Sequence, residues 1–144
     1  MAAATGRSAE IPLIDGHTHC FSPDVAAILT GVMDRCNLRA FNVCGIVCRG
    51  GLSSIQNPLA LLLKLLHPGT VYACGGLCYK LPPRTKSNFD PLGQAKRLMA
   101  LGFDGIKMIE GKPTAYKFTG IAMNDPVYDE YYSWIQAERI PVVF

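Results

Sequence analysis

The sequence has few charged residues and no run of basic ones. Only 17% of its 144 residues are Asp, Glu, Lys or Arg, and the net charge of +3 is scattered along the chain. Nucleic-acid-binding domains gather Lys and Arg on one face, often interleaved with aromatic residues. We therefore expect neither a nucleic-acid partner nor an anionic membrane surface. With 49% hydrophobic residues, the composition instead indicates a globular domain with a sizeable core.

Long hydrophobic runs are absent as well. The most apolar window, residues 59–66, is interrupted by Lys64, and residues 1–10 contain no stretch of signal-peptide length. These absences predict a soluble, cytoplasmic protein without a membrane segment and with a flexible N-terminus at residues 1–10. Because no export signal is visible, we expect all six cysteines to be thiols and not disulfides. They are Cys20, Cys36, Cys44, Cys48, Cys74 and Cys78.

What the sequence does contain is a regular succession of helix starts. Each start combines a side chain that accepts a hydrogen bond from a helix N-terminus with a proline, whose missing N–H costs nothing in the first helical turn. Hydrophobic residues with helical spacing follow, so the pattern predicts four helices packed on a core. The four starts are Ser22-Pro23, Asn57-Pro58, Asp90-Pro91 and Asp125-Pro126.

Short runs with strand character separate these helices. They occupy residues 41–48, 70–79, 104–109 and 140–144, and a further strand precedes the first helix. Arrays of helix pairs have repeats about as long as the spacing of these helix starts. The runs between the starts, however, are too short and too rich in β-branched residues to be helices. The order βαβαβαβαβ predicts a parallel sheet covered by helices. An open doubly wound sheet stays possible, although no glycine-rich phosphate motif follows the first strand.

The expected fold class is α/β, with four βα units and a fifth strand of a TIM-like (βα)8 barrel. Eight such units span roughly 250 residues, so we interpret residues 11–144 as the N-terminal half of a barrel. Leucines lie nearly all round the predicted helix at residues 59–66, as in helices with neighbours on every side. A missing half or a partner chain is expected to cover this surface. The unpaired edge strands predict a homodimer.

Two histidines, His17 and His19, follow the first predicted strand. At this spacing both imidazoles project from one face of an extended chain, at the barrel end where active sites lie. Zinc and similar ions bind imidazole nitrogen readily, and a catalytic site needs three or four protein ligands with one position open. The pair therefore predicts half of a metal site. A polar loop after the strand accounts for the same residues equally well.

Two stretches resemble the amidohydrolase superfamily, in its amidohydrolase-related branch. The first is Ile-Asp-Gly-His-Thr-His at residues 14–19, and the second is Gly-Phe-Asp-Gly-Ile-Lys-Met-Ile-Glu-Gly-Lys-Pro at residues 102–113. The resemblance implies a metal-dependent barrel that hydrolyses amide or ester bonds, or a decarboxylase or hydratase. It also implies a divalent metal, with zinc expected, held by His17 and His19.

The resemblance implies one further ligand at the fourth strand, either a carboxylated lysine or a carboxylate. Lys107 and Glu110 are the two candidates. In a regular strand they face opposite sides, so only one can point into the barrel unless the strand ends between them. Asp15 is expected either to orient one imidazole or to be an ordinary polar residue at a strand end. The remaining ligands, including the aspartate that activates water, would follow Phe144, so no catalytic residue is assigned.

Loops at the same barrel face are expected to bind the substrate. The loop after the third strand carries Arg84, and the stretch after the fourth carries Lys112, Tyr116 and Lys117. Their cations favour a small molecule that bears a carboxylate, although solvated loop lysines are the ordinary case.

Other functions are consistent with the same pattern. TatD-like nucleases and PHP-type phosphoesterases also begin with a His-x-His strand, but the residue 105–113 stretch is not typical of them. A non-catalytic half-barrel that acts by oligomerisation is the third possibility. Two cysteine pairs could also place four thiols on neighbouring strands, but zinc usually binds cysteines in tight turns, so we expect these thiols to pack in the core. The pairs are Cys44 with Cys48 and Cys74 with Cys78.

Overall fold

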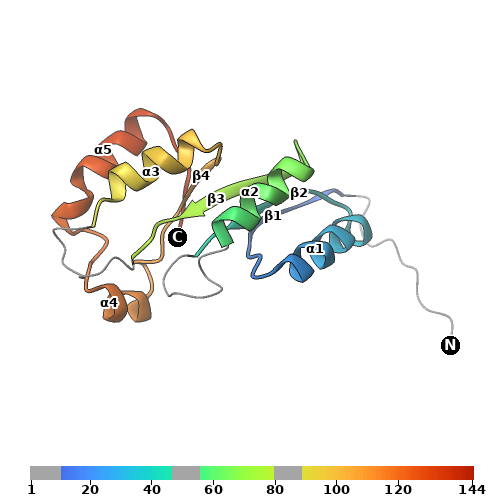
Figure 1. The fold of residues 1–144 in the computed structure, drawn as a ribbon, viewed down its shortest axis with the longest axis horizontal. Helices are drawn as coiled ribbons and strands as arrows, with labels where there is room; N and C mark the ends of the chain where they lie inside the picture. The colour runs from blue at the N-terminus through green and yellow to red at the C-terminus, as the bar shows by residue number, and fades with distance from the viewer. Residues whose placement is uncertain (1–10, 47–55, 80–88) are drawn as a thin grey trace.

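Five parallel strands form one curled sheet that makes a half-barrel (Figure 1). The computed structural model describes residues 11–46, 56–79 and 89–144. The strands follow one another in the order β1-β2-β3-β4-β5, so each pairs with its neighbour in sequence. This order has no reversal of direction and therefore excludes the doubly wound alternative. The strands are β1 (Leu13–Thr18), β2 (Leu38–Cys44), β3 (Val71–Gly76), β4 (Gly105–Lys107) and β5 (Val142–Val143).

Helices alternate with the strands and pack on the outer side of the sheet (Figure 1). Helix α1 contacts β2, α2 contacts β2 and β3, α3 contacts β4, and α3 and α5 lie against each other. The βαβαβαβαβ prediction is confirmed, although the strands are shorter than predicted at their C-terminal ends. The helices are α1 (Pro23–Cys36), α2 (Gln56–Leu66), α3 (Pro91–Ala100), α4 (Pro113–Thr119) and α5 (Asp129–Ala137), and a 3-10 turn, η3 (Pro126–Tyr128), precedes α5.

Three of the four predicted helix starts are N-caps. The side chain of Ser22 accepts from the Val25 N–H, that of Asp90 from the Gly93 N–H, and that of Asp125 from the Val127 N–H. The Asp125 cap belongs to η3, which leads into α5. The prediction that Asn57 caps a helix is wrong, because α2 begins at Gln56 and Asn57 lies inside its first turn.

The side chain of Asn57 instead binds the backbone at the end of β3. Its Nδ2 donates to the Gly76 carbonyl at 2.9 Å, and its Oδ1 accepts from the Gly76 N–H at 2.8 Å. Gln94 makes the same pair of bonds with the backbone of Cys78, at 2.7 and 3.2 Å. Helix amides thus satisfy backbone groups where the strands diverge and sheet partners are lost. A Cβ at position 76 would lie 2.3 Å from the Gly45 carbonyl oxygen, so only glycine fits there.

Side chains alternate between two chemically different faces of the sheet. Phe41, Val43, Val71, Ala73 and Ile106 are buried in the core between the sheet and the helices. Their neighbours on β2, β3 and β4 point to the concave side, which we call the inner face. It carries Asn42, Cys44, Tyr72, Cys74 and Lys107. The core therefore lies outside the curled sheet, and the inner face combines thiols and a tyrosine with an amide and a lysine.

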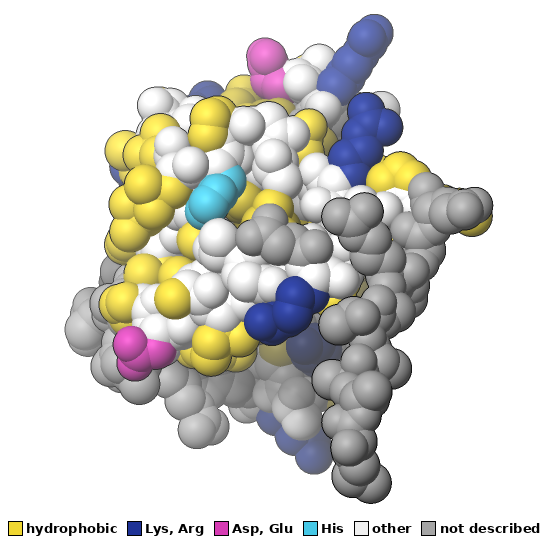
Figure 2. Space-filling view, turned by 90° about the vertical axis from the view of Figure 1, so that its right-hand side faces the viewer, with side chains coloured by type: hydrophobic (Ala, Val, Ile, Leu, Met, Phe, Trp, Pro, Cys, Tyr) yellow, Lys and Arg dark blue, Asp and Glu magenta, His cyan; other side chains and the backbone are white. Residues whose placement is uncertain are grey.

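One side of α2 is uncovered in this chain. Leu59 and Leu63 are buried, whereas Leu62, Leu65 and Leu66 are exposed. The face that carries α1 shows hydrophobic side chains gathered along one edge, with only scattered charges (Figure 2).

Within the described residues, no helix combines the length and the apolar character that crossing a membrane requires.

Removal of the Asn57 amide tests its role at the end of β3. We expect Asn57→Ala to lower the free energy of unfolding by about 1–3 kcal/mol, because the buried N–H and C=O of Gly76 lose their partners. Urea denaturation measures this change. Gln136→Ala, an exposed amide on α5, is the matched control and is expected to change stability by less than about 0.5 kcal/mol. Equal losses in both variants would contradict this role.

Candidate metal centre at the end of β1

The two histidines meet at the C-terminal end of β1. His17 Nε2 and His19 Nε2 lie 3.2 Å apart, and the rings meet edge to face. His19 Nδ1 lies 2.7 Å from the carbonyl oxygen of Cys44, at the end of β2. Because a carbonyl can only accept, Nδ1 of His19 carries the proton and Nε2 presents its lone pair. This tautomer, fixed by a backbone oxygen behind the ring, is the usual one for a metal-binding imidazole.

The strand is irregular where the histidines lie. The pairing of β1 with β2 shifts between Leu13 and Ile14 and again between Asp15 and Thr18. In the second shift, the Asp15 carboxylate accepts from the backbone N–H of His17 at 2.9 Å. Asp15 thus shapes the backbone that presents His17, and this bond does not involve an imidazole. Of the two expectations for Asp15, the structure supports the polar residue at a strand end.

Both imidazoles lie in a positive environment. Partial burial lowers the pKa of His17 and of His19 below 6.5, and the nearby charges of Lys107 and Lys112 lower both further. The hydrogen bond from His19 to Cys44 opposes this effect only in part. Both rings are therefore neutral at physiological pH, which is the state that binds a metal ion.

Lys107 lies on the inner face in β4, close enough to influence both histidines. Its side chain is fully buried, and Nζ has no hydrogen-bond partner among the described residues. Burial is the main reason why its pKa falls below 10.5. A buried amine without a partner is costly, so its presence beside two imidazoles requires an explanation other than stability.

Glu110, the alternative candidate, has different partners. The Tyr128 hydroxyl donates to one carboxylate oxygen, and the Ile109 N–H donates to the other at 2.8 Å. Burial beside this carboxylate raises the pKa of Tyr128. Tyr128 also contacts Phe89, Tyr131 and Tyr132 through its ring. Strand β4 ends at Lys107, so strand parity does not apply to Glu110, whose carboxylate lies in an aromatic cluster.

Of the expected substrate-binding residues, Tyr116 and Lys117 lie on a helix and not in a loop. Helix α4 follows Lys112 directly, with Pro113 in its first turn and Gly120 as a left-handed C-cap at a φ of 67°. The charge of Lys112 reaches both histidines and Lys107. Tyr116 and Lys117 are exposed on α4. The sequence did not reveal this helix because Lys112 makes no side-chain cap. Arg84 lies outside the described residues.

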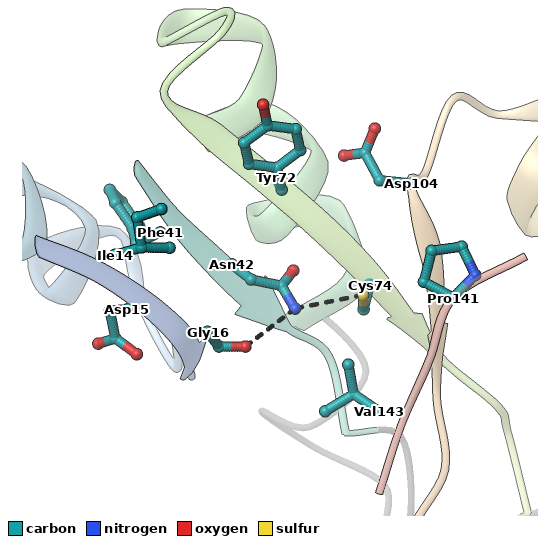
Figure 3. A pocket seen from close by; sticks show the side chains of 10 residues that line it. All are labelled: Ile14, Asp15, Gly16, Phe41, Asn42, Tyr72, Cys74, Asp104, Pro141 and Val143. Atoms are coloured by element: carbon teal, nitrogen blue, oxygen red, sulfur yellow. Dashed lines mark hydrogen bonds between the residues drawn. The ribbon is translucent and has the colours of Figure 1, made fainter. Parts of the chain in front are cut away.

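A hollow of about 260 Å³ lies on the inner face, lined by residues of β1, β2, β3 and β5 and by Asp104 and Pro141, which precede β4 and β5 (Figure 3). Asn42 crosses it, donating from Nδ2 to the Gly16 carbonyl at 3.2 Å and to Cys74 Sγ at 3.3 Å. Its Oδ1 has no partner among the described residues. Sequence reasoning missed Asn42, although a polar amide within a strand of apolar neighbours is a signal. The lining is Ile14, Asp15, Gly16, Phe41, Asn42, Tyr72, Cys74, Asp104, Pro141 and Val143.

The described residues contain no cluster of three or more His, Cys, Asp or Glu side chains able to hold a metal ion. The structure instead brings together two imidazoles and one amine. Comparison with protein-family models, with curated proteins and with solved structures finds no match for this chain.

Replacement of Lys107 tests whether burial of its amine lowers the stability of the fold. We expect Lys107→Met to raise the free energy of unfolding by about 1–3 kcal/mol, because an unpartnered buried polar group is replaced by an apolar chain of similar volume. The pKa of Lys107 is lowered on folding, so unfolding takes up protons and stability rises with pH between the folded-state pKa and 10.5. The gain in the variant is therefore full at neutral pH and shrinks toward pH 10.5. A loss of stability in urea denaturation at pH 7 would contradict this expectation.

Proposed function

We propose that this chain is the N-terminal half of a metal-dependent hydrolase barrel that cleaves amide- or ester-type C–N or C–O bonds. The observation that carries the proposal is the approach of His17 Nε2 and His19 Nε2 to 3.2 Å. The 3.2 Å separation matches a hydrogen bond from the His17 Nε2–H to the His19 Nε2 lone pair, and it also matches two nitrogens that each lie about 2.0–2.1 Å from one tetrahedral ion. The resemblance of residues 14–19 and 102–113 to amidohydrolases supports the same class.

The residues present fit a divalent ion, for which zinc is the proposed identity. His17 and His19 would bind it through Nε2, with the Cys44 carbonyl holding the second ring in place. Lys107, carboxylated at Nζ as the resemblance implies, is the strand-four candidate because its side chain is buried, Nζ has no hydrogen-bond partner among the described residues, and its charge influences both histidines. Glu110 is less suitable because Tyr128 and the Ile109 N–H engage its carboxylate. A bound ion would act as a Lewis acid and lower the pKa of a water at its open position.

We assign to this chain the binding of the metal and not the complete reaction. Two imidazoles and one strand-four group match the three protein ligands of a catalytic zinc site, but none of the three is assigned to take a proton from the bound water, so a further residue is required for the reaction. A second copy of the chain or additional chain segments would supply it, and a homodimer in the cytoplasm is part of this proposal. The open edges of β1 and β5 support such an association.

The proposed substrate is a small molecule with a carboxylate. Lys112 supports a carboxylate-bearing substrate, because its charge lowers the pKa values of His17, His19 and Lys107 and therefore lies near them. Tyr116 and Lys117 are exposed on the helix that begins beside it. These cations would hold the acidic group of a substrate near the metal. Arg84 stays a candidate from the sequence alone.

Zinc binding to the purified, chelator-treated chain tests the proposal. We expect calorimetry to give a stoichiometry near one zinc per chain. Single His17→Ala and His19→Ala substitutions are expected to weaken binding at least tenfold, because each removes one of the few ligands. His67→Ala removes a histidine that follows α2 and is the matched control, with unchanged affinity. Equal affinity in the three variants would overturn the proposal.

The same titration distinguishes the two strand-four candidates. Lys107→Met is expected to weaken zinc binding while the protein stays folded. Glu110→Gln keeps the shape of its side chain and the Tyr128 contact, and zinc affinity should not change. A weaker affinity in Glu110→Gln alone would assign the ligand to Glu110.

A further inference from the structure

Two cysteines face each other across the inner face. Cys44 ends β2, and Cys74 lies opposite it in β3, in direct register. Neighbouring strands are about 4.8 Å apart, which lies within the range of about 4.4–6.8 Å between the Cα atoms of a disulfide. Their side chains also point to the same side, because paired residues of a regular sheet share a face. The backbone is therefore already placed for a bond between the two sulfurs.

The two sulfurs share one hydrogen-bond donor. Asn42 Nδ2 lies 3.3 Å from Cys74 Sγ and 3.6 Å from Cys44 Sγ. Both sulfurs thus lie within hydrogen-bond reach of the same amide nitrogen. Figure 3 shows Cys74 with the Asn42 amide directed at it.

The two cysteines differ in how a reagent can reach them. Cys74 lines the hollow, whereas Cys44 has no exposed surface. Cys74 is therefore the sulfur that a reagent in the hollow reaches first, and we assign Cys44 as the resolving thiol.

We propose that Cys44 and Cys74 form a redox-active dithiol that a peroxide converts to an intrachain disulfide. The Cys74 sulfur attacks one oxygen of hydrogen peroxide, the O–O bond breaks, and water leaves with formation of a sulfenic acid. The sulfur of Cys44 then attacks the Cys74 sulfur, its thiol proton passes to the departing hydroxyl, and a second water leaves. The two thiols lose two electrons in total, and the peroxide gains them.

This inference does not depend on the proposed hydrolase function. It uses neither a metal ion nor either histidine side chain, so failure of zinc binding leaves it unaffected. The pair does lie next to the candidate centre, because the carbonyl oxygen of Cys44 is the partner of His19 Nδ1.

Mass spectrometry of the metal-free wild-type chain tests the proposal. The protein is treated with a small excess of hydrogen peroxide, and the remaining thiols are alkylated before digestion. We expect the loss of two hydrogen atoms per chain, reversed by dithiothreitol. Trypsin leaves Cys44 with Cys48 in residues 40–49, and Cys74 with Cys78 in residues 65–80. Fragmentation of the linked peptides must therefore locate the bond between Cys44 and Cys74.

Variants establish the order of the two steps. Cys74→Ser is expected to abolish the disulfide, whereas Cys44→Ser should leave a sulfenic acid at Cys74 that dimedone traps. Cys36→Ser removes an exposed thiol elsewhere and should form the disulfide as the wild type does. A bond between other cysteines, or alkylation of both Cys44 and Cys74 after peroxide treatment, would overturn the proposal.

A second measurement uses only the wild-type chain, so it tests the proposal even if the cysteine variants do not fold. Phenylarsine oxide bridges two neighbouring thiols, so one equivalent should protect both Cys44 and Cys74 of the wild-type chain from alkylation. Protection of neither cysteine would show that the sulfurs do not approach each other in solution and would contradict the proposal.

Discussion

The alternation of side chains along β2, β3 and β4 is the constraint on which both the fold and the candidate centre depend. One set of residues, including Val43, Ala73 and Ile106, packs against the helices and forms the core. The other set necessarily faces the concave side, where it meets the ends of β1 and β5. A shift of one residue in β4 would move Lys107 into the core between sheet and helices and Ile106 onto the inner face.

The regular part of the fold could be predicted from the sequence, because caps and strand composition are local signals. Ser22 and Asp90 begin helices as predicted, and the chain order of strands follows from short connections. Helix α4 could not be predicted, since Lys112 provides no cap. The role of Asn57 was also hidden, because its partner Gly76 is distant in sequence and only the folded sheet brings the two together.

At the candidate site, too, local features could be predicted from the sequence and contacts between distant residues could not. The His17 and His19 pair was visible because its spacing is local, but the Cys44 carbonyl that orients His19 is 25 residues away. Parity alone could not separate Lys107 from Glu110, because β4 ends between them. The inner face therefore brings two kinds of metal-binding atoms close together, imidazole nitrogens at β1 and thiol sulfurs at β2 and β3. Under the proposed function the imidazole nitrogens bind the ion, and the thiol sulfurs are the alternative ligands for a soft ion.

X-ray absorption at the zinc edge of the reduced, zinc-loaded chain tests the central claim most directly, because it identifies the atoms bound to the ion. The account predicts imidazole nitrogens at about 2.0–2.1 Å and no sulfur neighbour. Sulfur neighbours at about 2.3 Å would contradict it, because they would place the ion on Cys44 and Cys74 instead of on His17 and His19.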